Sequence, residues 1–473
     1  MGMTSEARVT VYGEFAANFV EDCLAKLCDP SGGIQTGPFG SQLHQQDYVP
    51  VGTPIITVEH LGENRIIHQD IPCVSDEDKE RLSKYILRKG DIVFSRVGSV
   101  DRRSLVRDAE NGWLFSGRCL RVRPDPDKID PVYLSYFFGL PSFKEHIRAI
   151  AVGATMPSLN TEILSNVIVP YPQDLNEQRA IARILGSLDD KIEANRCMNE
   201  TLEAIARAIF KSWFVDFDPM RAKAEGREPA GMDAETAALF PDSFEETERG
   251  MVPKRWKANN LGALLAVIET GSRPKGGVGN ITGGVPSIGA ESIEGLGRFD
   301  YAKTKFIPLE YYSSMKRGHV SDYDILLYKD GGRPGEFEPH ISLFGNGFPF
   351  DRFCINEHVY RLRAKPNLPQ SYLYFWLSSN SVMEEMRNRG TGVAVPGLNS
   401  TAVRGLQVLV PPNEILMKFD RFAMHVIQLI LSNSNESRYL SYIRDGLLPR
   451  LLSGDICLND LKFIKGDHNA SNT

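Results

Sequence analysis

The amino-acid sequence predicts an α+β protein with two tandem-duplicated globular modules. Two long helices are expected to join the modules and to pair as an antiparallel coiled-coil spacer with pseudo-twofold symmetry. Three observations predict this architecture: motifs that recur half a chain later, β-rich modules punctuated by Gly, Pro and Asp, and two helical segments with coiled-coil spacing. At 473 residues the chain is too long for one ordinary core, and its 42% hydrophobic content allows several.

The recurring motifs keep the same order in both halves of the chain. "IQTG" (34–37) returns as "IETG" (268–271), and "GTPIITVEHL" (52–61) returns as "GVPSIGAESI" (284–293). The later pairs are "GDIVFSRVG" with "YDILLYKDGG", "LRVRPDPDKIDPVYLSYFF" with "YRLRAKPNLPQSYLYFWL", and "GATMPSLNTEILSNVIVP" with "GVAVPGLNSTAVRGLQVLVP". Because the offset drifts only between 232 and 241 residues, the sequence indicates a tandem duplication and not chance matches.

Each repeat begins with a module of short strands and ends with a long helix. Apolar runs such as "TPIITV", "GDIVFS" and "NVIVPY" alternate with Gly, Pro and Asp, as strands joined by loops do. Each module closes at a proline, Pro172 or Pro412, and a helix is expected to begin within a few residues. The expected segments are a first module (1–173), a central helix (174–215), a linker (216–250), a second module (251–412), a C-terminal helix (413–453) and a tail (454–473).

The two helical segments carry apolar residues alternately four and three positions apart, which is the spacing of a coiled-coil seam. An ordinary amphipathic core helix is the commoner alternative, but about 39 residues at 1.5 Å each would span nearly 60 Å, longer than a small domain is wide. Asn195 and Asn199 are polar seam positions of the kind that fixes register at some cost in stability. The residues expected at the seam or at a partner interface are Ile181, Leu185, Leu188, Ile192, Asn195, Asn199, Leu202, Ile209, Trp213, Phe419, Val426, Ile430, Leu440 and Leu447.

Composition limits the possible classes of protein. The net charge of −6 argues weakly against a nucleic-acid binder, yet residues 81–123 hold 11 Lys or Arg against 4 Asp or Glu. This local excess is either a binding surface or an ordinary solvated face. We expect a cytoplasmic protein without a membrane segment, since no apolar run approaches 18 residues, no export signal is seen, and seven scattered cysteines lack a C-x-x-C pair.

Three segments resemble the DNA-specificity subunit of type I restriction–modification systems, and the resemblance covers nearly the whole chain. They are "TGPFGSQL" (36–43), "NEQRAIARILGSLDDKIEANRCMNETLEAIARAIFKSWFVDFDP" (176–219) and "LLPRLLSGDI" (447–456). The resemblance implies that each module is a target recognition domain for one half of a bipartite, asymmetric double-stranded DNA sequence. It also implies that the helices set the unread spacer. One departure is that "SWFVDFDP" has no counterpart after "RLLSG".

The resemblance further implies that catalysis belongs to partner subunits. Two adenine methyltransferase (modification) subunits would dock on the helices, and restriction or translocase subunits would join them. S-adenosylmethionine, ATP and Mg would then serve the partners, with no cofactor in this chain. The chain itself would be a non-catalytic subunit that directs adenine methylation and restriction.

Base edges and phosphates are contacted by Arg, Lys, Asn, Gln and hydroxyl side chains, which are available on several expected loops. The first-module candidates are Ser41, Gln42, His44, Gln45, Arg96, Arg102 and Arg103. The second-module candidates are Arg273, Lys275, Asn280, Lys329 and Arg333. Asn160 and Asn399, in "PSLN" and "PGLN", are better explained as helix caps than as contacts.

The sequence offers no convincing site for chemistry of its own. "FGNG" (344–347) comes without an adenine-binding segment, and "GGVGNITGG" (276–284) lacks the ending of a phosphate-binding loop. The histidines show no helical metal-ligand spacing, so no metal is expected. We therefore expect no enzyme. The alternative is a non-catalytic scaffold whose two modules bind proteins or peptides across the coiled coil, and a fused methyltransferase or nuclease is disfavoured by the missing motifs.

Overall fold

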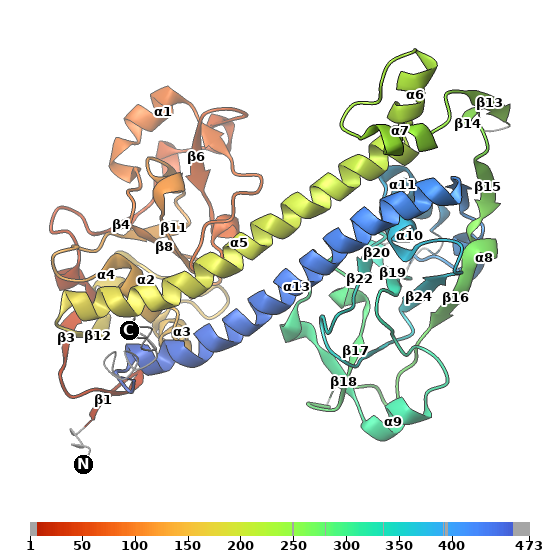
Figure 1. The fold of residues 1–473 in the computed structure, drawn as a ribbon. Helices are drawn as coiled ribbons and strands as arrows, with labels where there is room; N and C mark the ends of the chain where they lie inside the picture. Colours follow the sequence, from red (N-terminus) through yellow and green to blue (C-terminus); the bar gives the residue numbers. More distant parts are fainter. Residues whose placement is uncertain are drawn as a thin grey trace, which may run out of the picture. The chain divides into compact units, whose positions relative to one another are not determined.

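The computed structural model describes residues 7–247, 250–279, 281–333, 335–390, 392 and 396–456. The chain divides into two compact units (Figure 1). The first unit contains the residues up to Asp190 and those from Leu440 onward, and the second runs from Lys191 to Tyr439. Both combine helices with mainly antiparallel sheets, so the fold is α+β, as the sequence predicts.

The two longest helices are α5 (Leu175–Phe214) and α13 (Asn413–Leu452), with 40 residues each (Figure 1). Sequence analysis places them at 174–215 and 413–453. Each helix contributes residues to both units, so the units do not follow the expected boundaries between modules and helices. None of the helices in the described ranges has the length and apolar content needed to cross a membrane.

The first unit is built on a four-stranded antiparallel sheet in the order β4-β11-β8-β9, with a second sheet in the order β10-β6-β7-β5. Its strands are β1 (Arg8–Thr10), β2 (Gly13–Phe15), β3 (Phe19–Cys23), β4 (Ile34–Thr36), β5 (Tyr48–Val49), β6 (Thr53–Ile56), β7 (Cys73–Val74), β8 (Ile92–Ser95), β9 (Arg103–Leu105), β10 (Leu114–Phe115), β11 (Cys119–Val122) and β12 (Ile168–Pro172). Its short helices are α1 (Asp76–Arg81), α2 (Pro131–Phe137), α3 (Pro141–Ile150) and α4 (Thr161–Ser165).

The second unit contains a four-stranded antiparallel sheet in the order β16-β24-β19-β22. Its strands are β13 (Phe244–Thr247), β14 (Gly250–Pro253), β15 (Lys257–Asn260), β16 (Leu265–Thr270), β17 (Val285–Ile288), β18 (Lys305–Ile307), β19 (Ile325–Tyr328), β20 (Gly332–Arg333), β21 (Glu336–Phe337), β22 (Ile341–Leu343), β23 (Cys354–Ile355), β24 (Val359–Ala364) and β25 (Gln407–Val410). Its short helices are α6 (Asp218–Ala224), α7 (Ala234–Leu239), α8 (Leu261–Leu264), α9 (Leu309–Ser314), α10 (Gln370–Leu377), α11 (Asn380–Arg389) and α12 (Ser400–Arg404).

The four-stranded sheets of the two units share one register. In the first, Cys119 of β11 lies opposite Ser95 of β8. In the second, Val359 of β24 lies opposite Tyr328 of β19. The adjacent strand β10 pairs with β6 in parallel, and β23 pairs with β17 in parallel. Each motif pair found in the sequence therefore occupies the same strand position in its unit.

A buried aspartate anchors each four-stranded sheet through arginine. Asp91 is 1% exposed and accepts two hydrogen bonds of 2.7 Å from Arg123. Asp324 is completely buried and accepts hydrogen bonds from Arg361 and Arg363. A buried carboxylate is stable only when it is paired and hydrogen-bonded, so these pairs hold neighbouring strands in register.

The long helices pack into the core of each unit. In the first unit, Ile181 and Leu185 of α5 share a hydrophobic cluster with Leu451 and Leu452 of α13. In the second, the rings of Phe210 and Phe419 contact at 5.6 Å between centroids, with Phe214 beside them. Because these side chains are almost fully buried, helix pairing and module folding depend on the same apolar surface.

Within each unit, α5 and α13 run antiparallel. In the second unit, Asn195 of α5 is buried and donates to the carbonyl of Asn433 and the carboxylate of Glu436. In the first unit, Asp189 accepts a hydrogen bond of 2.7 Å from Arg444. In the second unit Phe210, later in α5, contacts Phe419, earlier in α13. In the first unit Ile181 shares a cluster with Leu451. Later residues of α5 thus contact earlier residues of α13.

The stretch that sequence analysis assigns to a linker (216–250) is largely folded. It contains α6 and α7, and the side chains of Met220 and Phe240 are buried in the core of the second unit. Lys223 fastens the two helices by donating to the carbonyls of Ala237 and Phe240. Burial of these apolar residues against Trp213 and its neighbours explains why the segment does not remain extended.

Asn160 and Asn399 are helix caps, as the sequence predicts. The side chain of Asn160 accepts a hydrogen bond of 2.7 Å from the amide of Ile163 at the start of α4. Asn399 does the same for Ala402 at 2.8 Å at the start of α12. Each cap satisfies a backbone donor that the first helical turn leaves without a partner.

Candidate nucleic-acid interface

Three segments of the first unit meet where strand β8 ends. The amide of Arg96, directly after β8, donates to the carbonyl of Arg118 at 2.8 Å. The amide of Leu159 donates to the carbonyl of Arg96, and Gly98 donates to Pro157, both at 2.8 Å. These backbone bonds hold the loops after β8, before β11 and before α4 together as one frame.

A fourth segment, the turn after β4, approaches the same frame closely. A Cβ atom at Gly37 would overlap the carbonyl oxygen of Ser116, so this position accepts only glycine. The turn then projects Phe39, which is 62% exposed. An exposed ring beside polar loops provides an apolar surface for a ligand.

Guanidinium groups gather at this end of the sheet. Arg118 is exposed and Arg96 is half-buried, and within the described residues neither side chain has a hydrogen-bond or ion-pair partner. Burial raises the pKa of the Cys119 thiol to about 12, and the positive charges of Arg102 and Arg96 oppose that rise. Arg96 and Arg118 are neighbours because their backbones are hydrogen-bonded to each other, and their side chains can donate to phosphates or to base edges.

The second unit builds the same frame. The amide of Lys329, directly after β19, donates to the carbonyl of His358 at 2.9 Å. The amide of Leu398 donates to the carbonyl of Lys329, and Gly331 donates to Pro396, both at 2.8 Å. The frame therefore has the same three loops and the same three backbone bonds as its counterpart.

The side chains on this second frame are paired with one another. Arg273 donates to the Glu357 carboxylate at 2.6 Å and to Nε2 of His358 at 2.8 Å. Because Arg273 can only donate, Nε2 of His358 accepts and its Nδ1 carries the hydrogen that Asp330 accepts at 2.6 Å. Lys329 completes the chain with a 3.0 Å contact to Asp330. Two cations and two carboxylates give this chain of side chains no net charge.

One predicted candidate, Arg103, is wrong as a DNA-facing residue. Its side chain is only 2% exposed. It lies on β9 and donates to the Glu63 carboxylate at 2.7 Å and to the carbonyl of Ser135 at 3.1 Å. A guanidinium held in this way stabilises the contact between β9 and α2 and is not available to a ligand.

The other first-module candidates take different positions. Arg96 lies on the frame described above, whereas the guanidinium of Arg102 donates to the carbonyl of Leu61 and is partly committed inside the unit. Gln42 accepts a hydrogen bond from the hydroxyl of Tyr85, so its amide is partly committed inside the unit. His44 and Gln45 are exposed on the loop that follows the Gly-Pro-Phe-Gly turn. Nothing is described of the side chain of Ser41.

In the second unit, Arg273 and Lys329 are brought together by the chain of charged residues. Lys275 and Arg333 are exposed, the latter on the hairpin of β20 and β21. Asn280 lies outside the described residues. DNA contact by these residues stays a prediction.

Sequence analysis missed Arg118, Asp330, Glu357 and His358. Each lies next to a residue or strand of the recurring motifs. Arg118 directly precedes "CLRVR", and His358 directly precedes "VYRLR". The available signal was the alignment of these two strands, combined with the expectation that loops at one sheet edge converge.

The expected seam residues differ in burial. The buried ones are Ile181, Leu185, Asn195, Phe419, Val426 and Ile430. The partly buried ones are Leu188, Ile192, Asn199, Leu202, Ile209, Trp213, Leu440 and Leu447. The amide of Asn199 donates to the carbonyl of Ile430 and to the hydroxyl of Ser434. A role in binding a partner subunit stays a prediction for all of them.

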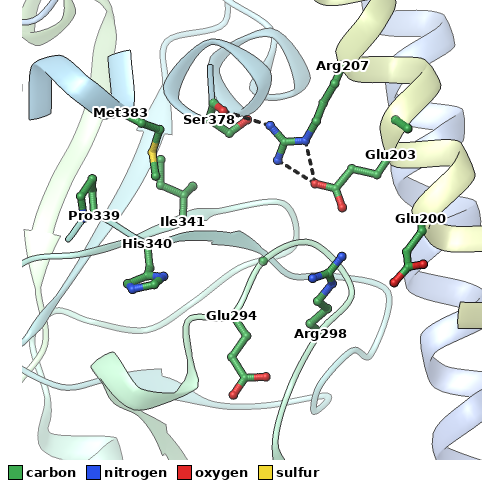
Figure 2. Close-up of a pocket in the computed structure, with 12 residues that line it drawn as sticks. Glu200, Glu203, Arg207, Glu294, Arg298, Pro339, His340, Ile341, Ser378 and Met383 are labelled. Carbon is green, nitrogen blue, oxygen red and sulfur yellow. Dashed lines mark hydrogen bonds and ion pairs between the residues drawn. The ribbon is translucent and has the colours of Figure 1, made fainter. Parts of the chain in front are cut away.

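A separate hollow of about 420 Å³ lies beside α5 in the second unit (Figure 2). Arg207 crosses it, donating to Glu203 and to the carbonyl of Ser378. Glu200 and Glu294 also line the hollow, together with Arg298 and His340. Its three carboxylates outnumber its two guanidinium groups, and its lining residues are not those of the frame, so we do not assign the hollow to the candidate interface.

Comparison with known proteins agrees with this arrangement. Residues 39–204 match the family model described as the type I restriction modification DNA specificity domain. The chain is 25% identical over 392 residues to the MjaIX specificity subunit of Methanocaldococcus jannaschii, covering 82% of each chain. It is 26% identical over 434 residues to the HindI specificity subunit of Haemophilus influenzae, covering 83% of this chain and 92% of that one.

The chain is therefore similar to type I restriction–modification specificity subunits over most of its length. A solved S subunit from M. genitalium has a similar fold, with a TM-score of 0.57 at 15% identity. That likeness covers 96% of this chain and 98% of the other. The similarity in fold therefore extends over both units and both long helices.

Proposed function

We propose that this chain is the DNA-specificity subunit of a type I restriction–modification complex and that each unit binds one half of a bipartite, asymmetric target. The observation that carries the proposal is the repeated frame. Both units use the same three backbone hydrogen bonds to present loops, yet the side chains on those loops differ in identity and in net charge. One scaffold with two sets of side chains suits a protein that recognises two different half-sites.

The proposal includes a tandem duplication and an antiparallel coiled-coil spacer with pseudo-twofold symmetry. The shared strand register of the four-stranded sheets supports the duplication. Hydrogen bonds from Asn195 and Asn199 of α5 to α13 support a spacer with fixed register. A spacer of fixed length would set the number of base pairs left unread between the half-sites.

Partner subunits would supply the chemistry. Large apolar side chains of the long helices remain exposed, including Ile205 at 46% and Ile443 at 47%, as expected where a partner protein covers a surface. We propose that two methyltransferase subunits dock there and that restriction or translocase subunits join the assembly in the cytoplasm. S-adenosylmethionine, ATP and Mg would then be bound by the partners, while this chain contributes binding without catalysis.

Salt-dependent DNA binding tests the proposal. The purified complex of this chain with its methyltransferase partner is titrated onto duplex DNA between 50 and 200 mM salt. Because neutralised phosphates release counterions, a complex with six to ten phosphate contacts should lose roughly 10³- to 10⁵-fold in affinity over that range. Weak, salt-independent association with DNA, together with tight binding of a protein or peptide, would favour the scaffold alternative.

A further inference from the structure

Five positions in each unit surround the repeated frame. They are equivalent because the strands next to them share one register and because the same backbone bonds join the loops that carry them. The pairs, first unit before second, are Phe39 and Arg273, Arg96 and Lys329, Val97 and Asp330, Gly117 and Glu357, and Arg118 and His358.

Several residues that hold or support the frame are the same in both units, whereas these five positions differ. The identical frame residues are Gly98 and Gly331, Pro157 and Pro396, and Leu159 and Leu398. The buried aspartates Asp91 and Asp324 each pair with an arginine of the neighbouring strand. The helix caps Asn160 and Asn399 are likewise identical. These supporting residues are thus identical in the two units, and all five surrounding positions differ. The scaffold and the binding surface are therefore built from different residues.

We propose that these five positions determine base specificity in each half-site, an inference that rests on the proposed DNA-binding function. In the first unit they offer an exposed ring and two arginines, and no carboxylate within ion-pair distance among the described residues. Arginine donates two hydrogen bonds to the O6 and N7 atoms of guanine, and an apolar ring can contact the methyl group of thymine. The first half-site is therefore expected to contain guanine at the bases that Arg96 and Arg118 meet.

The second unit presents acceptors as well as donors. The carboxylates of Asp330 and Glu357 are acceptors of the kind that bind the amino groups of cytosine or adenine. Among the described residues, Oε2 of Glu357 has no hydrogen-bond partner and is buried. Arg273, which holds Glu357, and Lys329, which holds Asp330, orient these oxygens before any ligand arrives. The second half-site is therefore expected to contain cytosine or adenine where these carboxylates meet the bases.

Selection of DNA from a random library tests the assignment. The purified complex of the full chain with its methyltransferase partner is mixed with randomised duplexes, and the bound DNA is sequenced. The wild-type complex should select a two-part motif. Arg118→Ala should lower the preference at one base pair of one half roughly 5- to 150-fold and leave the other half unchanged. His358→Ala, which removes one of the two partners of the Asp330 carboxylate, should relax the opposite half only.

Two matched variants serve as controls. Arg88→Ala removes an exposed arginine in the turn that precedes β8, at the opposite end of that strand from Arg96. Lys365→Ala removes an exposed lysine at the opposite end of β24 from His358. Both should leave both halves of the motif unchanged.

Three outcomes would contradict the inference. The first is an unchanged base preference in both Arg118→Ala and His358→Ala. The second is a relaxed base preference in both half-sites of either variant. The third is a uniform loss of affinity without a relaxed base preference, which would indicate a phosphate contact. Retention of the untouched half-site in each variant shows that the complex has folded and assembled. A wild-type complex that selects no motif would instead contradict the proposed function itself.

Discussion

The two candidate interfaces share a backbone frame but differ in electrostatics. At the first, Arg96 and Arg118 contribute a charge of +2 with no carboxylate partner in the described part of the chain. At the second, the charges of Arg273 and Lys329 are cancelled by Glu357 and Asp330, +2 against −2. The difference shows that fold and recognition chemistry are specified by separate residues.

The difference also predicts how each interface would bind DNA. Unpaired guanidinium groups can meet phosphates or guanine without first breaking an internal contact, so they favour affinity and counterion release. Paired side chains must exchange one partner for another, so they contribute less net affinity but discriminate against bases that cannot replace the lost partner. We expect the first unit to dominate salt dependence.

The largest expected effect concerns the buried aspartates that support the two frames. Asp324→Ala leaves Arg361 and Arg363 without their shared carboxylate, and losing one partner of a buried ion pair costs about 3–5 kcal/mol. Asp91→Ala leaves a single arginine, Arg123, so its cost should be smaller. Hydrogen exchange of the full chain should show a loss of protection in β19 and β24 for Asp324→Ala. It should show a weaker loss of protection in β8 and β11 for Asp91→Ala. Equal effects would contradict this ranking.

The interface arginines should affect DNA binding more than stability. The double variant Arg96→Ala with Arg118→Ala should weaken binding to the selected motif by about 2–6 kcal/mol, if both arginines meet guanine. It should also reduce the salt slope, because both guanidinium charges are unpaired among the described residues. Lys329→Ala should change the slope by less than one, because Lys329 is already paired with Asp330. Titrations at several salt concentrations measure both. A larger change in salt slope for Lys329→Ala than for the double variant would contradict the expectation that the first unit dominates the salt dependence.

The exposed isoleucines of the long helices test the expected partner surface. Ile205→Asp and Ile443→Asp each place a charge on an exposed apolar position, so helix stability should change by less than about 0.5 kcal/mol. Methyltransferase binding should fall by more than about 1 kcal/mol in each case. Co-purification quantifies the bound subunits, with the exposed Arg179→Asp on α5 as a control for added charge. Full binding in both variants would place the partner elsewhere.

The smallest effect is a pH dependence of the second interface. Burial alone would raise the pKa of Glu357, but the hydrogen bond from Arg273 holds that pKa below its ordinary value of 4.5. A carboxylate whose pKa is lower in the folded than in the unfolded protein increases the free energy of unfolding at pH values above its unfolded-state pKa. This contribution is lost as the pH falls through its folded-state pKa.

Arg273→Ala should therefore lower the free energy of unfolding near pH 7 by under about 1 kcal/mol, since both groups are partly solvent-screened. The difference from wild type should shrink between about pH 5 and pH 3. Denaturant titrations of the full chain at both pH values check this, with the exposed Lys275→Ala as control. If the difference in the free energy of unfolding between wild type and Arg273→Ala grew as the pH fell, the ion pair would not be the source of the stabilisation.

Much of the fold could be predicted because it depends on periodicity and local chemistry. The spacing of apolar residues placed both long helices to within one residue of α5 and α13. The caps at Asn160 and Asn399 are local interactions, so their sequence context was sufficient. The folded segment containing α6 and α7 was missed because Met220 and Phe240 become buried only through contact with residues distant in sequence.

The candidate site was less predictable. An arginine in a basic stretch can point to solvent or into the core, and composition does not separate Arg103, which is buried against Glu63, from Arg96. Arg118 and His358 become neighbours of Arg96 and Lys329 only through strand pairing. Whether a charge is free or paired is thus decided by tertiary contacts.

The most direct test of the central claim is a map of N6-methyladenine in the genome of the source cell, with this chain intact and with its gene deleted. The account predicts a methylated, two-part asymmetric motif that is present in the intact cell and absent after deletion. An active methyltransferase partner whose methylation pattern is unchanged by the deletion would contradict the claim that this chain selects the DNA target.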